Sequence, residues 1–132
     1  MQKGNLAVVG LMTSEIEFWD LNLKDPVEPS LQLKGKNAHS QAVTALDLHY
    51  SRKNLLMSGS QDQSIKIWDL EKNNCIITKK GLKSGVKNAF WLSQKDSLIC
   101  ALTEQNEIKV FDVRSDEKEQ ICKLNLEIEN LC

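Results

Sequence analysis

The feature that most constrains the fold of this chain is that its sequence repeats itself. Displacing the sequence by 43 residues, without a gap, sets Val43 on Val86 and the pair Trp68-Asp69 on Phe111-Asp112. Displacing it by 49 residues in the other direction sets the same Trp-Asp pair on Trp19-Asp20. The chain is therefore built of three related units, and a period in the forties indicates a repeat architecture.

The complete unit spans residues 39–81 and has the pattern of successive strands. Apolar residues alternate from Val43 to Leu48, a second run covers 55–57, a tight turn falls at 61–63, and a third strand ends in Trp68-Asp69. This pattern resembles a WD40 repeat, which forms one blade of a β-propeller. The resemblance implies an all-β fold of antiparallel four-stranded blades, of which the 132 residues make about two and two-thirds.

Four positions carry the resemblance: His39, Ser58, Asp62 and Trp68. In WD40 repeats these positions form a hydrogen-bonded tetrad inside the blade. The resemblance implies that the indole N–H donates to the hydroxyl, the hydroxyl to the imidazole, and the imidazole to the carboxylate. Such a chain is physically sensible, because a buried Trp and a buried His each need a partner for their polar atoms.

The two other units are less complete. In the first, residues 6–9 match the second strand of the complete unit and 16–19 the third, so the first strand either precedes the sequence or comes from another segment. Leu31–Leu33, after two prolines that cannot donate to an interior ladder, is the expected outer strand of this unit. Val9 and Thr13 occupy the positions of Ser58 and Asp62, so this unit has no tetrad.

The third unit has lost every member of the tetrad at once. Leu82, Ala101, Gln105 and Phe111 stand at the positions of His39, Ser58, Asp62 and Trp68, respectively. A concerted loss is favourable because a partly satisfied buried polar network is less stable than an apolar replacement. Strands are nevertheless expected at 86–91, 97–102, 108–113 and 121–126.

These units divide the chain into four parts. They are an incomplete first blade with a proline-containing connection (1–38), the complete repeat (39–81), a degenerate repeat (82–126), and a tail or the start of a further unit (127–132). The marks at the ends of the repeats are Trp19, Asp20, Trp68, Asp69, Phe111 and Asp112. Because a propeller closes with four to eight blades, the chain is part of a longer propeller, an arc completed by another chain, or an open assembly.

A more specific resemblance lies in the first half of the chain. The segment from Ala7 to Leu21, a Val-Glu-Pro connection and the pair Ala38-His39 together resemble the periodic tryptophan protein 1 family. This resemblance implies an interaction scaffold in ribosome biogenesis and rRNA processing, located in the nucleus and nucleolus; without it, the expected location is the cytoplasm. The alternative is a general WD40 adaptor subunit, for instance of a ubiquitin-ligase or chromatin complex.

The sequence favours a binding protein over an enzyme. It contains no phosphate-binding glycine loop, no His-Glu-x-x-His motif and no Cys/His set at metal spacing, so no cofactor, metal or small-molecule substrate is expected. Apolar runs are too short to span a membrane. Ser58, His39 and Asp62 have the residue types of a hydrolase triad, but a Ser within a strand and the need to explain Trp68 favour the structural tetrad. His49 is expected at a half-exposed strand end, and Trp91 in packing between blades.

One surface patch is a candidate for binding partners. Lys79, Lys80, Lys83 and Lys87 lie in and beside the connection between the second and third units, and in propellers this connection reaches a face often used for binding. The expected partners are proteins, including a pre-ribosomal complex, with RNA contact weak or indirect because arginine and aromatic residues are absent from the patch. The alternative is that these lysines belong to a solvated loop that binds nothing. The candidate face consists of Lys36, Gln41, Gln61, Gln63, Lys79, Lys80, Lys83, Lys87, Glu104 and Asn106.

Overall fold

The computed structural model describes residues 5–22, 24, 28–34, 37–92 and 97–114, together with the backbone of 122–125. Its regular elements are strands, and no helix within these ranges has the length and apolar character needed to cross a membrane. The strands are β1 (Leu6–Gly10), β2 (Ile16–Asp20), β3 (Leu31–Leu33), β4 (Val43–Leu48), β5 (Leu55–Ser60), β6 (Ile65–Asp69), β7 (Asn74–Lys79), β8 (Val86–Trp91), β9 (Leu98–Thr103), β10 (Glu107–Asp112) and β11 (Cys122–Asn125).

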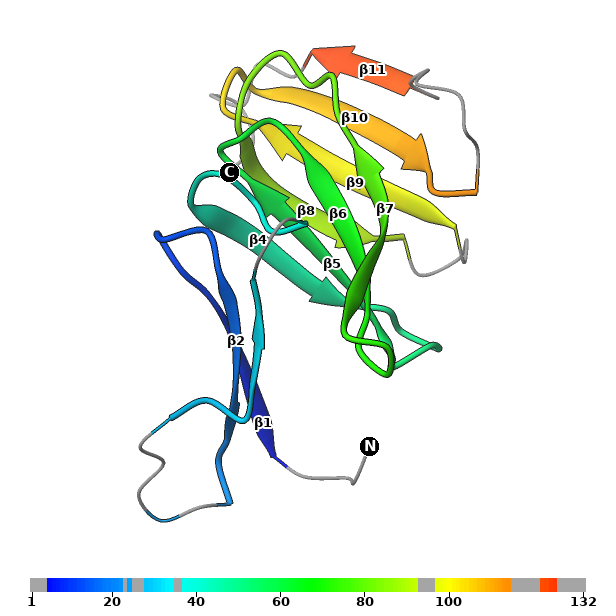
Figure 1. Ribbon diagram of the computed structural model, residues 1–132. Coiled ribbons are helices and arrows are strands. Elements are labelled where there is room, and N and C mark those ends of the chain that lie inside the picture. The colour runs from blue at the N-terminus through cyan, green and yellow to red at the C-terminus, as the bar shows by residue number, and fades with distance from the viewer. Residues whose placement is uncertain are drawn as a thin grey trace.

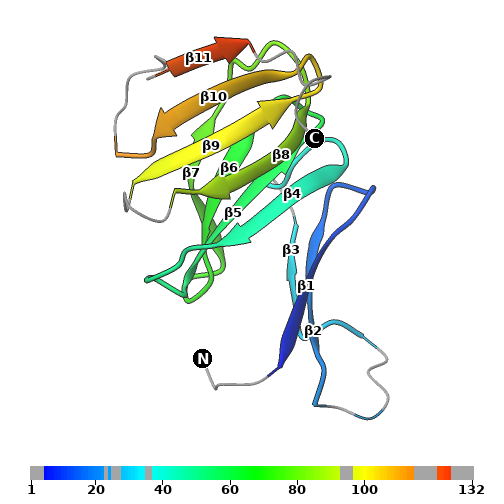
Figure 2. The ribbon, with the colours of Figure 1, turned by 180° about the vertical axis from the view of Figure 1, so that it is seen from behind.

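These strands form three antiparallel sheets, in which each strand pairs with its neighbour along the chain. The first sheet has the order β1-β2-β3, the second β4-β5-β6-β7 and the third β8-β9-β10-β11 (Figure 1). In the first sheet no described strand corresponds to β4 or β8, as the repeat alignment predicts. Seen from behind, β4 and β8 lie side by side where the second and third sheets meet (Figure 2).

The turn between the two middle strands of each repeat has the same backbone conformation in all three sheets. Ser14, Gln63 and Asn106 occupy the same repeat position, and all have positive φ, at 79°, 68° and 61°. In each turn the N–H of this residue donates to a carbonyl three residues earlier, as from Gln63 to Ser60 at 3.3 Å. A turn followed by a left-handed residue is a common way to close a hairpin with a short loop. The repeat therefore extends from the sequence to the backbone dihedrals.

The inner strands of the second sheet, β5 and β6, are buried on both faces. On β6, Ile65 and Ile67 pack in one apolar cluster with residues of the third sheet, whereas Trp68 packs in another cluster with residues of the first sheet. All five residues of β6 are buried, including Lys66. Alternation of side chains along the strand sends successive residues to opposite faces, so polar residues on either face have little access to water.

Polar contacts fix β4 against β8 across the boundary between the two sheets. The backbone N–H of Trp91 donates to Asp47 Oδ2 at 2.8 Å, and its indole Nε1 donates to the Asp47 carbonyl at 3.2 Å. The hydroxyl of Thr44 donates to the Val86 carbonyl. Trp91 is only 6% exposed, as expected for packing between blades.

The expectation for His49 is wrong. Its side chain is buried rather than half exposed, with 2% of its surface accessible. The imidazole stacks on the ring of Tyr50 at a centroid distance of 4.7 Å and meets the ring of Trp91 edge-on at 4.6 Å. Its Nδ1 accepts the backbone N–H of Arg52 at 3.0 Å. The sequence did not reveal this burial because Trp91, which covers the ring, belongs to the next unit.

Glycine occupies a point of close approach between neighbouring sheets. A Cβ added to Gly59 on β5 would lie 2.6 Å from Val86 Cγ1 on β8, and one added to Gly10 on β1 would lie 2.7 Å from Val43 Cγ1 on β4. Gly10 and Gly59 hold the same repeat position, so two successive boundaries use the same small-against-branched contact. In the third unit the position is occupied by Leu102.

Replacing Gly59 with Ala should destabilise the chain by about 1–3 kcal/mol, because the added methyl group forces Val86 out of place. In a double-mutant cycle measured by chemical denaturation, Gly59→Ala combined with Val86→Ala should cost clearly less than the sum of the two single changes. Additive effects would mean that the two residues do not meet.

Candidate functional site: the buried tetrad and the cavity beside it

The structure brings His39, Ser58, Asp62 and Trp68 into one chain of hydrogen bonds. Trp68 Nε1 lies 2.8 Å from Ser58 Oγ, Ser58 Oγ lies 2.7 Å from His39 Nε2, and His39 Nδ1 lies 2.9 Å from Asp62 Oδ2. The strands β5 and β6 position Ser58 and Trp68, the turn between them carries Asp62, and the segment before β4 carries His39. Four side chains that are separated by up to 29 residues thus meet within one sheet.

The order of these contacts fixes the positions of the protons. The indole of Trp68 can only donate, so Ser58 Oγ accepts from it and directs its own proton to His39 Nε2. The imidazole proton is then on Nδ1, from which it is donated to the Asp62 carboxylate. The neutral Nδ1–H tautomer satisfies every member of the chain.

Ser40 and Ser64 complete the surroundings of the Asp62 carboxylate. The backbone N–H of Ser40 donates to Oδ2 at 3.0 Å, the backbone N–H of Ser64 donates to Oδ1 at 3.0 Å, and the Ser64 hydroxyl also donates to Oδ1. Neither serine was predicted from the sequence to belong to this site. A Ser two residues after a turn Asp was the available signal, because short polar side chains and backbone N–H groups commonly close such turns.

Burial and hydrogen bonding shift the pKa values of His39 and Asp62 downward. For His39, burial lowers the pKa below the ordinary value of 6.5, the attraction of Asp62 opposes this, and the charge of Lys66 adds to it. For Asp62, burial raises the pKa, but hydrogen bonds from Ser64 and from the Ser40 backbone outweigh burial, so the pKa falls below 3.8. At neutral pH the pair is a neutral imidazole that donates to a carboxylate.

This geometry does not support a hydrolase triad. Ser58 has no accessible surface, and the indole of Trp68 already occupies its oxygen. A nucleophilic serine must be reachable by substrate. Ser58, His39 and Asp62 are therefore placed to hold the blade together.

The third unit replaces the tetrad by an apolar contact. Leu82, Ala101 and Phe111, at the positions of His39, Ser58 and Trp68, are all buried in one apolar cluster. Gln105, at the position of Asp62, is exposed. No polar atom of the former tetrad is thus left buried in that blade.

The Asp residues at the ends of the repeats have a local structural role. Oδ1 of Asp20, Asp69 and Asp112 accepts the backbone N–H of the residue two positions later, at 2.9, 3.0 and 2.9 Å. The hydrogen bond from Arg114 lowers the pKa of Asp112. These carboxylates close the turns that follow β2, β6 and β10. The aromatic partners differ: Trp68 and Phe111 are buried, whereas Trp19 donates its indole N–H to Glu17 at 3.0 Å.

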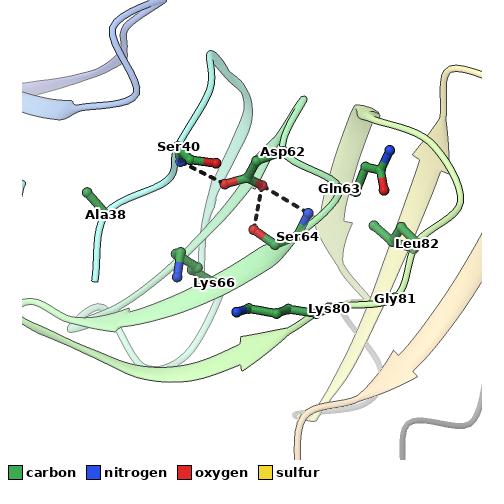
Figure 3. Close-up of a pocket in the computed structure, with 9 residues that line it drawn as sticks. All are labelled: Ala38, Ser40, Asp62, Gln63, Ser64, Lys66, Lys80, Gly81 and Leu82. Atoms are coloured by element: carbon green, nitrogen blue, oxygen red, sulfur yellow. Dashed lines mark hydrogen bonds between the residues drawn. The ribbon is translucent and has the colours of Figure 1, made fainter. Parts of the chain in front are cut away.

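A cavity of about 410 Å³ lies beside the tetrad, between the second sheet and the connection from β7 to β8. Figure 3 shows Lys66 and Lys80 extending into the same part of this cavity, below the Asp62 carboxylate. The lining residues are Ala38, Ser40, Asp62, Gln63, Ser64, Lys66, Lys80, Gly81 and Leu82. Sequence reasoning had placed only Gln63 and Lys80 of these in the candidate face.

The other described residues of the candidate face do not line this cavity. Gln61, Glu104 and Gly85 meet where the second and third sheets adjoin, since a Cβ on Gly85 would lie 3.0 Å from Gln61 Cα and 3.1 Å from Glu104 Cδ. Gln41, Lys83, Lys87 and Asn106 are exposed, Lys79 is half buried at the end of β7, and Lys36 lies outside the described residues. Of the four lysines in and beside the connection from β7 to β8, Lys80 alone lines the cavity.

In the part of the chain that the structure describes, no three His, Cys, Asp or Glu side chains are grouped closely enough to hold a metal ion. The cavity offers the hydroxyl groups of Ser40 and Ser64, the ammonium groups of Lys66 and Lys80, and one carboxylate, Asp62, whose oxygens already accept hydrogen bonds. Two ammonium groups against one occupied carboxylate suit an anion rather than a cation.

Comparison with known proteins identifies the fold. Residues 30–69 match the family described as "WD domain, G-beta repeat". The β-propeller domain of Cps50 (Swd1) from Myceliophteria thermophila superposes with a TM-score of 0.73 at 19% identity, over 93% of this chain and 36% of that one. The expected all-β fold, a fragment of a WD40 β-propeller, is confirmed.

Curated relatives carry varied names. An uncharacterized WD repeat-containing protein of Schizosaccharomyces pombe is 38% identical over 89 residues, 55% of this chain and 17% of that protein. The Periodic tryptophan protein 1 homolog of Drosophila melanogaster is 26% identical over 123 residues, 86% of this chain and 27% of that protein. The COMPASS component SWD3 of Saccharomyces cerevisiae is 36% identical over 77 residues, which are 58% of this chain and 22% of that protein. The chain thus spans only about a quarter or less of these relatives.

Removing one member of the tetrad should destabilise the chain more than the equivalent change in the third unit. Asp62→Ala removes the carboxylate that accepts the His39 proton and leaves only the Ser64 hydroxyl, 3.1 Å from Nδ1, so it should cost about 1–3 kcal/mol. Gln105→Ala, at the same repeat position but exposed, should cost less than about 0.5 kcal/mol. Equal losses in chemical denaturation would contradict the structural role of the tetrad.

Stability should also fall as the pH is lowered through 6.5. Because the pKa of His39 is lower in the folded chain than in the unfolded chain, the unfolded state takes up the proton first. Unfolding free energies measured between about pH 7.5 and 5.5 should decline for the native sequence and decline less for His39→Gln. Asp62 adds a separate loss only below its ordinary pKa of 3.8, since its folded pKa is also lowered. The same slope in His39→Gln would rule out His39 as the titrating group.

Proposed function

We propose that this WD40-repeat chain is a non-enzymatic scaffold that binds a partner protein through the loop face of its second and third sheets. This loop face consists of segments 38–41, 61–64, 80–85 and 104–106. The observation that carries the proposal is that loops from two sheets meet at one edge of the fold, where Gln61 of the second sheet lies beside Gly85 and Glu104 of the third. WD40 domains generally bind proteins, and binding residues on loops are most effective when a rigid frame positions them.

Backbone hydrogen bonds provide that rigidity. The N–H of Gln61 donates to the Ala42 carbonyl at 3.1 Å, and the N–H of Glu104 donates to the Gly85 carbonyl at 2.9 Å. Within the second sheet, the Ser60 hydroxyl donates to the Gln41 carbonyl at 3.1 Å. Each loop of the face is thereby tied to a strand or to the neighbouring loop, so a partner would meet it without a large ordering cost.

The pathway we propose is ribosome biogenesis and rRNA processing, with the protein in the nucleus and nucleolus. The support is the similarity to the Periodic tryptophan protein 1 homolog, which extends over 86% of the chain, together with the segment from Ala7 to Leu21. RNA contact, if present in such an assembly, would be indirect or weak.

The second candidate is an adaptor subunit of another multiprotein complex. The observation that favours it is the similarity to a relative named as a COMPASS component, at 36% identity over 77 residues. Both candidates use the same loop face and differ only in the partner.

Affinity capture from nuclear extract, with and without RNase, separates these candidates. Pre-ribosomal proteins that remain bound after RNase would support the first, and a non-ribosomal complex would support the second. A face variant, Gln61→Arg with Glu104→Arg, should reduce capture about tenfold or more. The matched control is Asn74→Arg with Glu71→Arg, which makes the same charge change at exposed positions around the turn from β6 to β7. If the face variant captures the same proteins as the native chain, the loop face is not the binding surface.

A further inference from the structure

Lys66 is a buried cation with no acidic partner among the described residues. Its side chain is 8% exposed, and Nζ donates one hydrogen bond to Thr78 Oγ1 at 3.2 Å. The ion pairs found in the described ranges are His39–Asp62 and Lys109–Glu107, and neither includes Lys66. Buried lysines are rare unless they are paired, because desolvation of an ammonium group is unfavourable.

The third unit contains a lysine at the same repeat position, and the acid beside it belongs to the same unit. Lys109 holds the repeat position of Lys66 and is fully buried, with Nζ 3.5 Å from Glu107 Oε2. The position of Glu107 is occupied in the second unit by Ser64. One repeat therefore carries both charges, and the other carries only the positive one.

The carboxylate that lines the same cavity as Lys66, that of Asp62, is already hydrogen-bonded. Both oxygens of Asp62 accept hydrogen bonds, from His39, from Ser64 and from the backbone of Ser40. Those contacts hold the tetrad, so Asp62 cannot turn toward Lys66 without breaking them. The acid that would pair with Lys66 must come from elsewhere.

A second lysine faces the same space. Lys80 lies at the start of the connection from β7 to β8 and lines the cavity with Lys66, and no ion pair of the described residues includes it. Gly81, next to it, has a φ of +95° and no atom within 4 Å of the place where a Cβ would be, so the mouth is open here. Ser40 and Ser64 add hydroxyl groups, and Leu82 adds an apolar wall. The lining thus holds two ammonium groups and one carboxylate, Asp62, so its net charge is positive and attracts an anion.

We propose that this cavity, which we call the Lys66–Lys80 cavity, binds an anionic side chain of the partner protein, either a carboxylate or a phosphorylated serine. The ligand's oxygens would take hydrogen bonds from both ammonium groups and stand in the place that Glu107 takes beside Lys109. The proposal rests on the scaffold function above for the statement that the ligand belongs to a protein.

The cavity suits a single side chain better than a nucleic-acid backbone. Its lining contains no arginine and no aromatic ring on which a base could stack, and its volume of about 410 Å³ accommodates one side chain. The chain has a net charge of −1, so it offers no general attraction to a polyanion.

Amide chemical shifts of the ¹⁵N-labelled chain provide the test. The probes are inorganic phosphate and three capped tripeptides of glycine with a central phosphoserine, glutamate or serine, followed by a short oligouridylate. We expect saturable shifts at Ser40, Ser64 and Gly81 with phosphate and with at least one of the two anionic peptides, and none with the serine peptide. Raising the salt concentration from about 0.05 M to about 0.5 M should weaken binding.

Variants locate the response. Lys80→Gln, which changes an exposed residue and should leave the fold intact, and Lys66→Gln should each weaken peptide binding about tenfold or more. Lys66→Arg, which keeps the positive charge, should retain most of the peptide binding of the native chain. The matched control is Lys53→Gln, which removes one exposed positive charge from the turn between β4 and β5 and should bind like the native chain.

The proposal is overturned if the three amides do not respond, if Lys80→Gln and Lys53→Gln bind alike, or if oligouridylate binds at the cavity more tightly than either anionic peptide. A response to only one anionic peptide would keep the proposal and name the ligand group. This assay is independent of affinity capture. Peptide binding without any captured partner would count against the scaffold, whereas capture that is unchanged in Lys80→Gln would count against the cavity alone.

Discussion

The constraint on which the structure depends is that the second sheet must bury both faces of its inner strands, β5 and β6. Its central strand β6 lies between apolar clusters of the first and third sheets, so every residue of that strand is removed from water. Apolar residues can be removed from water without needing a hydrogen-bond partner. Polar residues on the same strand and its neighbour require partners, because an unsatisfied buried group costs more than its hydrogen bond contributes. The tetrad around Ser58 and the contacts of Lys66 both follow from that requirement.

The repeats meet the requirement in different ways. The second unit joins Trp68, Ser58, His39 and Asp62 in one hydrogen-bonded chain, whereas the third unit replaces three of these with apolar residues. The buried lysine shows the opposite distribution, since the third unit supplies an acid for Lys109 and the second supplies none for Lys66. The third unit thus carries an acid beside its own buried lysine. The second unit instead has a cavity lined by Lys66, Lys80 and Asp62, and this difference underlies the binding site proposed above.

Much of the fold could be predicted, and the reason is local. Strand bounds agree within about one residue with the expected segments at 86–91, 97–102 and 108–113, since alternation and turn residues are properties of short stretches. Contacts between units could not be predicted as well from the sequence. His49 is buried by Trp91 from the next sheet, and only two of the nine residues that line the cavity, Gln63 and Lys80, were in the predicted face.

By itself, the sequence determined the repeat, the antiparallel four-stranded sheets and the residue types at the tetrad, because a period and a pattern of polar and apolar residues are encoded along the chain. Only the tertiary structure decided which charges are left without a partner. Lys66 and Lys80 line one cavity because the connection from β7 to β8 passes beside β6. The Asp62 carboxylate accepts a hydrogen bond from His39 instead of pairing with either lysine. Whether a charge is compensated depends on distances in space and on burial, and neither of these is a property of a single stretch of sequence.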